Sequence, residues 1–311
     1  MEPNKLFSPD STGTRRKPIF LIATAVAFLI SAIAFAEPGT IELPATVPER
    51  IVSLSPAATE ILCAVGAENQ LIARTDYCDY PPEVRKIPSV GGFDAKTLSL
   101  EKILSFRPDF VYMTKGMHDH LVSPLRKYGI YTYVSDAESI SGIYKEITDI
   151  GAITGHPEKA GDICADMRKT FSSIKTALDS EKSVSVYWEV WNSPYMSVGG
   201  ISFLNEVIET AGGKNIFTDI KQTYPLVNEE SIIMRNPDVI VITKTGSITA
   251  ETVKKRNGWQ EMSAVKNDRI ITMDADIASR PGPRIVQAVI DLAISLHPDN
   301  DALKQLFKNK D

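Results

Sequence analysis

Aromatic side chains gather in the segments that follow the expected β-strands. Seven of them lie there: Tyr77, Tyr80, Phe93, Trp188, Trp191, Tyr195 and Tyr224. Loops are normally poor in aromatic residues, and these side chains combine large apolar faces with polar tips. Together they favour a binding site for a bulky planar ligand with polar edges. For Trp188 and Tyr80, an ordinary place in the core is an equally good interpretation.

Residues that carry out covalent chemistry do not occur in a familiar arrangement. The sequence has no nucleophile elbow, no Gly-rich phosphate loop and no His-Glu-x-x-His, and the pair Gly199-Gly200 carries no weight alone. His118 and His120 could begin a metal site, but no third ligand is evident, which favours a solvated loop. We therefore predict no catalytic residues, no metal site and no permanently bound cofactor.

One phrase of the sequence occurs twice. Ser99–Thr114 matches Asn228–Thr243 without a gap, and each copy reads as a helix cap, a short helix, a proline and a buried strand. Both copies place a glutamate two residues after the cap, Glu101 and Glu230. Acids in a first turn complement the helix dipole, but the gapless match favours a duplication. We expect two similar lobes, each with an exposed acid on a common docking face.

Alternating strand and helix patterns predict an α/β fold with parallel strands. A mature chain of roughly 270 residues is too long for one compact core, so two domains are expected. Residues 37–49 are an N-terminal extension, 50–155 the first lobe and 183–311 the second. Apolar residues at three- and four-residue spacing through 156–182 predict one long amphipathic helix. The expected fold is two Rossmann-like lobes with parallel central sheets joined by one long α-helix.

The expected elements follow from apolar runs and from helix start and stop residues. The predicted strands are Arg50–Leu54, Gln70–Arg74, Asp109–Met113, Tyr131–Val134, Val184–Val190, Asp238–Thr243 and Arg269–Met273. The predicted helices include Pro56–Val65, which Gly66 ends, and also Ser202–Ala211 and Pro283–Leu296. Ligands bind beyond the carboxyl ends of parallel strands, so the loops after these strands should form the site.

The N-terminus reads as a targeting segment. A basic cluster from Arg15 to Lys17 precedes Ile19–Ala36, which carries no charge and ends in Ala-Phe-Ala. This pattern predicts a signal peptide over residues 1–36, cleaved near Ala36, and export of the mature chain. The apolar run is also long enough to span a membrane, so an uncleaved anchor stays open.

The net charge argues against a nucleic-acid partner, and the cysteine content limits the possible disulfides. The net charge is −5, which offers no surface for nucleic acid. The three cysteines, Cys63, Cys78 and Cys164, cannot all pair internally, and no C-x-x-C spacing occurs. A Cys63–Cys78 bridge stays open in an oxidising compartment.

Three segments carry a resemblance to a known family. Arg50–Glu60, Asp76–Pro82 and Leu100–Ile103 resemble the helical-backbone (class III) substrate-binding proteins of ABC importers, and the second of them resembles the cobalamin branch of that family. The resemblance covers essentially the whole mature chain. It implies a periplasmic, non-catalytic receptor that captures cobalamin or a related corrinoid between two lobes.

The resemblance also implies which residues contact the ligand. Tyr77 matches a family tyrosine at the corrinoid, and Phe93 and Tyr224 stand where the family has tryptophans. Trp191 matches an aromatic residue of the second lobe, with Trp188 as the alternative one-residue shift away. Asp276 matches an acid that faces the ligand, although Ile277 replaces the aromatic residue beside it.

Partners and alternative ligands follow from the same resemblance. Glu101 and Glu230 coincide with glutamates that pair with arginines of an ABC permease dimer, which works with cytoplasmic ATPase subunits. Haem is an alternative ligand, for which Tyr77 would be the axial residue. A ferric siderophore is another, for which Arg74 and Arg280 are the available cleft arginines. The identity of the corrinoid and of the permease stays open.

Overall fold

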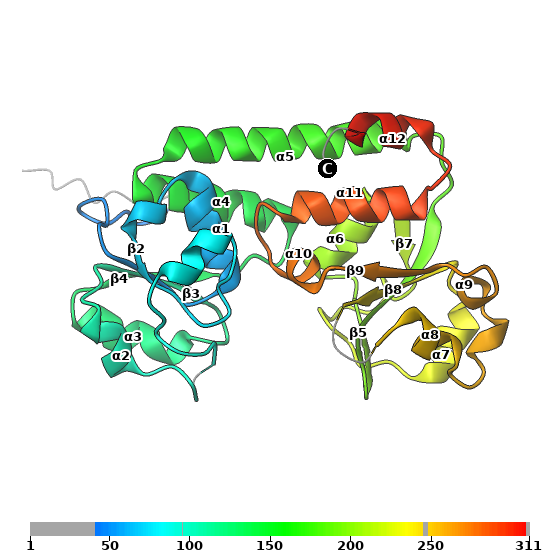
Figure 1. Cartoon of the computed structure of the whole chain (residues 1–311), viewed down its shortest axis with the longest axis horizontal. Helices are drawn as coiled ribbons and strands as arrows, with labels where there is room; N and C mark the ends of the chain where they lie inside the picture. Colours follow the sequence, from blue (N-terminus) through cyan, green and yellow to red (C-terminus); the bar gives the residue numbers. More distant parts are fainter. Residues whose placement is uncertain (1–40, 95, 245–247, 309–311) are drawn as a thin grey trace, which may run out of the picture. The chain divides into compact units, whose positions relative to one another are not determined.

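The computed structural model describes residues 41–94, 96–244 and 248–308 (Figure 1). The described residues from Glu42 onward form one compact unit. The expected signal peptide, residues 1–36, therefore lies outside the described residues. Within the described ranges, none of the helices combines the length and apolar character needed to cross a membrane.

The first sheet is wholly parallel, in the order β2-β1-β3-β4. Its strands are β1 (Ile51–Ser53), β2 (Leu71–Ala73), β3 (Phe110–Thr114) and β4 (Tyr131–Ser135). Ile51 of β1 lies beside Leu71 of β2 and Phe110 of β3. Strands β1 and β3 are buried along nearly their whole length, as parallel strands covered on both faces should be.

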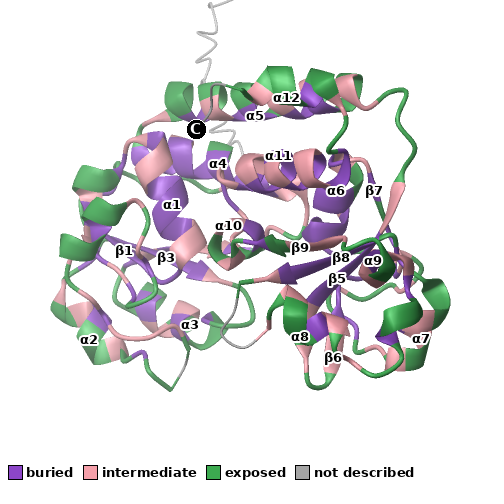
Figure 2. Cartoon of the chain, turned by 45° about the vertical axis from the view of Figure 1, so that its right-hand side comes forward, coloured by how far each residue is buried: buried purple, intermediate pink, exposed green. Residues whose placement is uncertain are grey.

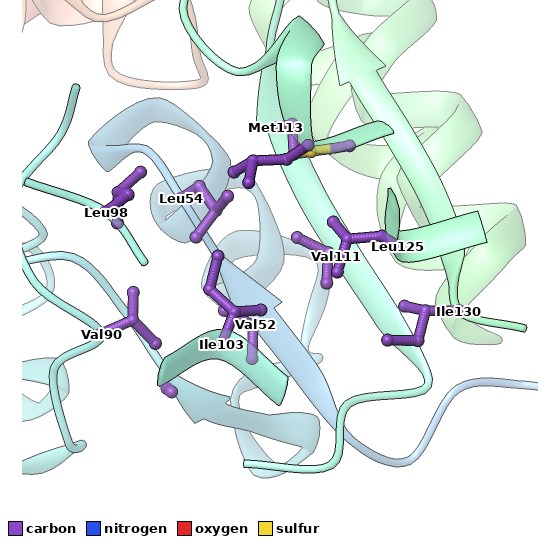
Figure 3. Close-up of a cluster of buried hydrophobic side chains, with 11 residues drawn as sticks. Val52, Leu54, Val90, Leu98, Ile103, Val111, Met113, Leu125 and Ile130 are labelled. Carbon is purple, nitrogen blue, oxygen red and sulfur yellow. The ribbon is translucent and has the colours of Figure 1, made fainter. Parts of the chain in front are cut away.

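Helices surround this first sheet. They are α1 (Pro56–Val65), α2 (Leu100–Ser105), α3 (Asp119–Lys127) and α4 (Ile140–Thr154), with short 3₁₀ turns at Glu68–Gln70 and Pro82–Lys86. The hydroxyl of Ser55 caps α1 by accepting from the Ala58 amide at 3.1 Å, and Gly66 ends the helix at φ 94°. Figure 3 shows how Ile103 of α2 and Leu125 of α3 meet Val52 and Val111 of the strands in one apolar core.

The second sheet repeats this order and adds one antiparallel strand. Its strands are β5 (Val184–Asn192), β6 (Tyr195–Ser197), β7 (Gly213–Asn215), β8 (Val239–Thr243) and β9 (Ile270–Met273). The parallel set β7-β5-β8-β9 corresponds to β2-β1-β3-β4 of the first sheet. Figure 2 shows strands β5 and β8 as the buried centre of this lobe.

The sheet of the second lobe is mixed, because one antiparallel strand that the sequence did not predict is added to its parallel set. Strand β6 runs antiparallel to the end of β5, with Asn192 opposite Tyr195. From the sequence, this segment is expected to be a loop because it follows the predicted strand Val184–Val190. In the structure, the short Ser193-Pro194 connection joins two strands that hydrogen-bond to each other.

The described helices of the second lobe are short except for α11 (Ile285–Leu296). They are α6 (Phe203–Thr210), α7 (Glu229–Arg235), α8 (Ala250–Lys254), α9 (Ser263–Lys266), α10 (Ala275–Ser279), α11 and α12 (Asp301–Phe307), with a 3₁₀ turn at Trp259–Glu261. A second apolar core joins the buried aromatic residues Tyr187, Phe217 and Trp259 to the strands and to Ile232 of α7.

The duplicated phrase has the same backbone conformation in both lobes. Ser99 accepts from the third amide of α2 at 3.2 Å, and Asn228 does the same for α7 at 2.8 Å. Arg107 and Asn236, which precede the matched prolines, both adopt the left-handed conformation, at φ 49° and 43°. This conformation is rare outside glycine, so its recurrence at equivalent positions supports the structural equivalence of the two segments.

Matched aspartates bind the beginning of the central strand in each lobe. The Asp109 carboxylate accepts from the amides of Glu49 and Arg50 at 2.8 and 3.0 Å. The Asp238 carboxylate accepts from the amide of Ser185 at 3.0 Å and from its hydroxyl at 2.6 Å. The two copies of the phrase therefore share their long-range hydrogen bonds as well as their conformation.

The long helix α5 (Pro157–Ala177) packs against elements of both lobes. It contacts α1 and α4 of the first lobe and α6, α11 and α12 of the second (Figure 1). It ends five residues before the predicted end at Lys182. The Asn300 side chain donates to the Ala177 carbonyl at 3.0 Å, which satisfies an orphan acceptor at the helix end, and the chain then turns toward β5.

The cysteines do not form a disulfide. Cys63, Cys78 and Cys164 all lie in the described ranges as free thiols, so the bridge that the sequence left open is absent. Burial raises the pKa of the Cys63 thiol to about 12. The sulfur of Cys78 lies 3.1 Å from the Thr75 hydroxyl.

A buried carboxyl group on α4 predicts a pH-dependent stability. Glu146 accepts hydrogen bonds from Tyr112 and, at 2.8 Å, from Ser135, and it is 2% exposed. Burial raises its pKa from 4.5 to about 7, so the folded chain binds more protons than the unfolded chain between these values. The Glu146 contribution to stability should therefore decline as pH rises through this window, by at most about 1.4 kcal/mol per pH unit.

Chemical denaturation at pH 5 and pH 8 measures this effect. The free energy of unfolding of the natural protein should decline relative to that of E146Q, which has no carboxyl group to titrate there. E158Q, at an exposed position on α5, should follow the natural protein at both pH values. Parallel pH profiles for the natural protein and E146Q would contradict the assignment.

Candidate ligand-binding site

The carboxyl ends of β1, β2 and β3 lie at one edge of the first sheet, because these strands are parallel. Tyr77 follows β2 at this edge and is 62% exposed. Tyr80 is 42% exposed. The guanidinium of Arg284 lies over its ring, 3.9 Å from the ring centroid. Tyr77 is therefore a large aromatic side chain that the protein leaves uncovered.

The loop that carries Phe93 lies beside the Tyr77 loop. The Asp76 amide donates to the Gly91 carbonyl at 2.8 Å, and the Ser89 hydroxyl donates to the Asp76 carboxylate at 2.6 Å. Phe93 is half-buried, and its ring meets the ring of His118 edge-on at 5.4 Å. The structure thus brings Phe93 and Tyr77 to the same edge of the first sheet.

His118 is buried, so the prediction of a solvated loop is wrong for this residue. Its Nδ1 accepts from the Thr114 amide at 3.0 Å, and its Nε2 lies 2.7 Å from the Phe93 carbonyl. His120 is exposed, as predicted. Among the described residues, no group of three or more His, Cys, Asp and Glu residues is arranged to hold a metal ion.

In the second lobe, Trp191 projects from the β5–β6 hairpin. It is 52% exposed, and its indole N–H donates to the Ser193 carbonyl at 3.0 Å. Trp188 is 1% exposed and belongs to the core, so Trp191 is the one of these two tryptophans whose side chain is exposed. The antiparallel hairpin thus presents the tryptophan that the sequence analysis placed in a loop.

Two glycines hold the Tyr224 loop against β6. The Gly199 amide donates to the Thr223 carbonyl at 3.0 Å, and the Gly200 amide donates to the Ile220 carbonyl at 2.8 Å. A Cβ atom would lie 1.9 Å from a backbone oxygen at Gly199 and 2.1 Å from another at Gly200. The Gly199-Gly200 pair is therefore needed, because the backbone of the Tyr224 loop comes too close to leave room for a side chain at either position. Tyr224 is 38% exposed.

Asp276 belongs to a cluster of charged groups. It lies in α10, and its carboxylate is 2.7 Å from the Arg280 guanidinium. Arg280 also reaches Glu60 of α1 and Asp79 of the Tyr77 loop, both at 2.9 Å. Glu60 is held in addition by Arg284, whose Nε donates at 2.7 Å. We name Glu60, Asp79, Asp276, Arg280 and Arg284 the inter-lobe ion cluster, because it joins α1 to α10 and α11.

The charged groups of this cluster form ion pairs with one another. The Glu60 side chain is 2% exposed and the Arg280 side chain is 11% exposed. Burial acts to lower the pKa of Arg280, but the bonds to Glu60 and Asp79 outweigh it and raise the pKa above its usual value. Burial likewise acts to raise the pKa of Asp79, and the bond from Arg280 lowers it below the usual range. Arg280 and Asp79 are therefore charged and paired near neutral pH.

Sequence reasoning named Asp276 and Arg280 but not their partners. The missed residue with the clearest signal is Glu60, the one charged residue on the buried face of α1, whose other buried residues are apolar except for Thr59. A glutamate on a buried face that keeps its charge is paired with a cation. The sequence does not say which arginine that partner is, because 220 residues separate Glu60 from Arg280.

The two expected docking glutamates have similar surroundings. Glu101 and Glu230 are both exposed and occupy the second position of α2 and α7. The Ser99 hydroxyl donates to Glu101 at 2.6 Å, and this bond lowers the pKa of Glu101. The adjacent Glu229 is different, because its carboxylate accepts from the Trp259 indole at 2.6 Å.

These features define a two-lobed binding protein with uncovered aromatic residues at the sheet edges. The chain belongs to the periplasmic binding protein family, whose sequence model matches residues 51–277. The family consists of transport receptors, which confirms the predictions of family, fold class and absence of enzymatic activity. The chain is thus a substrate-binding component of an ABC importer, a class that works with a permease and an ATPase.

Individual relatives support this assignment. An uncharacterised ABC transporter substrate-binding lipoprotein of Bacillus subtilis, YvrC, is 33% identical over 260 residues, covering 81% of each chain. The vitamin B12-binding protein of Vibrio cholerae is 30% identical over 243 residues, covering 78% of this chain and 86% of its own. Its crystal structure, named BtuF, has a TM-score of 0.69 and covers 81% and 98% of the two chains at 28% identity.

A haem-binding relative has a similar fold. The periplasmic heme-binding protein RhuT of Roseiflexus has a TM-score of 0.71 at 24% identity, covering 82% of this chain and 99% of its own. At this identity the likeness concerns the fold alone.

Proposed function

We propose that this protein captures cobalamin or a related corrinoid and delivers it to the permease of an ABC importer. In this proposal, Tyr77 and Phe93 of the first lobe and Trp191, Tyr224 and Asp276 of the second contact the ligand. The mature chain is exported and begins after residue 36, and lobes 50–155 and 183–311 flank the linking helix. Glu101 and Glu230 then dock the two lobes on the permease dimer.

The observation that carries the proposal is the exposure of large aromatic side chains in both lobes. Tyr77 is 62% exposed, Trp191 52% and Tyr224 38%. A soluble protein gains little by displaying such side chains, whereas a planar ligand of corrinoid size would cover them. The vitamin B12-binding protein of Vibrio cholerae supports the choice of ligand, because its likeness extends over most of this chain.

The arginines argue against a siderophore as the ligand. Arg74 donates to the backbone carbonyls of Val84, Thr75 and Arg85 at 2.8, 2.7 and 3.1 Å. Arg280 is bound within the inter-lobe ion cluster. Both cations that would meet an acidic chelate are thus engaged by the protein itself. Haem remains the second candidate, because the phenol of Tyr77 is exposed and can serve as an axial ligand.

Replacing Tyr77 by alanine should weaken corrinoid binding by about 30-fold, equivalent to ~2 kcal/mol, because an aromatic anchor is lost from the contact surface. Equilibrium dialysis with cyanocobalamin measures the change. Y128A is the matched control. Tyr128 is 67% exposed, but it lies between α3 and the amino end of β4, whereas Tyr77 follows the carboxyl end of β2. Equal affinities for Y77A, Y128A and the natural protein would exclude Tyr77 from the site.

A further inference from the structure

We propose that His118 is a positioning residue for the ligand site: it fixes Phe93 by binding the Phe93 backbone while its own ring is held by the end of β3. This inference rests on the proposed function, in which Phe93 contacts the ligand. It deepens that proposal, because it names a buried residue on which the first-lobe aromatic surface depends.

The hydrogen bonds determine the tautomer of the imidazole ring. The Thr114 amide can only donate, so Nδ1 of His118, 3.0 Å away, must be the acceptor and carries no proton. The proton is then on Nε2, which donates to the Phe93 carbonyl at 2.7 Å. One ring thus connects a strand amide to the Phe93 carbonyl, and both nitrogens are satisfied in a fully buried residue.

The anchoring side of this connection is rigid. Thr114 is the last residue of β3 and pairs with Ser135 of β4. The His118 amide donates back to the Thr114 carbonyl at 3.0 Å, and the Asp119 carboxylate accepts from the Gly116 amide at 3.1 Å. The loop from Thr114 to Asp119 is therefore closed on itself, and the imidazole has a fixed direction.

The receiving side is the loop that presents Phe93. This loop is bound to the Tyr77 loop at Gly91, and Asp94 accepts from the Thr97 amide at 3.0 Å. Phe93 lies between these two points, where His118 binds its carbonyl and packs edge-on against its ring at 86°. Loss of the imidazole would free the ring to adopt other rotamers, and ordering it again would cost binding free energy.

The charge state agrees with this role. Burial lowers the pKa of His118, and although the bond to Phe93 and the nearby Asp119 act to raise it, the net direction is downward; His120 adds to the lowering. The ring is therefore neutral near neutral pH, as acceptance by Nδ1 requires. The buried position also accounts for the difference from His120, which is exposed and has no such task.

A double-mutant cycle tests the proposal. H118N keeps a short acceptor for the Thr114 amide but does not reach Phe93, and F93A removes the ring that would contact the ligand. Calorimetric titration with cyanocobalamin should show about 2- to 10-fold weaker binding for H118N, the range of one lost hydrogen bond. In the F93A background, H118N should cause no further loss. H118Q, which can place a donor near the Nε2 position, should restore most of the affinity.

Several outcomes would overturn it. An equal loss from H118N with and without F93A means that His118 acts through the fold and not through Phe93. The same conclusion follows if H118Q binds as weakly as H118N. If H118N does not fold, H118F replaces it in the cycle, because it keeps the ring volume and loses both bonds.

Failure of the proposed ligand gives a different signature. If the natural protein binds haemin and not cyanocobalamin, the corrinoid proposal fails while the same cycle, run with haemin, still decides the role of His118. If F93A binds either probe as well as the natural protein, Phe93 is not in the site, and the inference about His118 fails with it.

Discussion

Replacing Glu60 by alanine should lower the free energy of unfolding by about 3–5 kcal/mol, the usual cost of removing one partner from a buried ion pair. The carboxylate is 2% exposed and accepts from both Arg280 and Arg284. Without it, the guanidinium groups of Arg280 and Arg284 lose the buried carboxylate that both of them bind. Chemical denaturation at neutral pH measures the change directly.

The control for this prediction is E158A, because Glu158 is an exposed first-turn acid of α5 and should cost less than about 1 kcal/mol. E60A should also weaken ligand binding, since Arg280 holds Asp276 and Asp79 on either side of the cluster. A free energy of unfolding for E60A within 1 kcal/mol of the natural value would contradict the buried role of this carboxylate.

Reversing the charge of both docking glutamates should abolish transport while leaving binding intact. In E101R/E230R, two exposed carboxylates at matched helix positions become cations, so the ligand site and the core are untouched. Charge-assisted pairs with permease arginines would turn into repulsion at both contacts, which should reduce uptake more than 30-fold. Uptake by reconstituted vesicles that hold the permease and ATPase is the measurement.

E158R is the matched control for the reversals, because Glu158 occupies the same second helical position of α5 and is also exposed. It should transport as well as the natural protein. Affinity and melting temperature should stay unchanged in all these variants. Normal uptake by E101R/E230R would refute the docking proposal and leave the repeated phrase as a trace of duplication alone.

Much of the fold is predictable from the sequence because its signals are local. Ser55 with Pro56 and Gly66 mark the two ends of α1, and the apolar run after Pro108 predicts β3. The duplicated phrase also predicts that the chain forms two similar lobes, since the same cap, stop and strand recur in the same order. These features depend on neighbours within one turn or one strand.

The features that the sequence did not predict depend on contacts between distant segments. Strand β6 belongs to an aromatic segment that has the composition of a binding loop, and its pairing with β5 appears only when both are folded. The last carbonyl of α5 accepts a hydrogen bond from Asn300, more than a hundred residues away. His118 and Glu60 are typical surface residue types that become buried because Phe93, Arg280 and Arg284 reach them from other elements.

In the ligand site, too, some features can be predicted from local sequence and others depend on the folded structure. Residue type and position after a strand were enough to indicate Tyr77 and Tyr224 as exposed aromatic residues. Whether Trp188 or Trp191 faces solvent depends on the pleat of β5, in which side chains alternate between faces, and on where the hairpin begins. The paired state of Arg280, which weakens the siderophore alternative, required the structure.

Titration of the purified mature protein with cyanocobalamin in a calorimeter tests the central claim most directly. The account predicts one binding site, a submicromolar dissociation constant typical of importers of scarce nutrients, and a parallel change in the visible spectrum. Haemin titrated under the same conditions should bind much more weakly. Saturation by haemin with no heat and no spectral change from cyanocobalamin would contradict the corrinoid assignment and point to haem as the transported ligand.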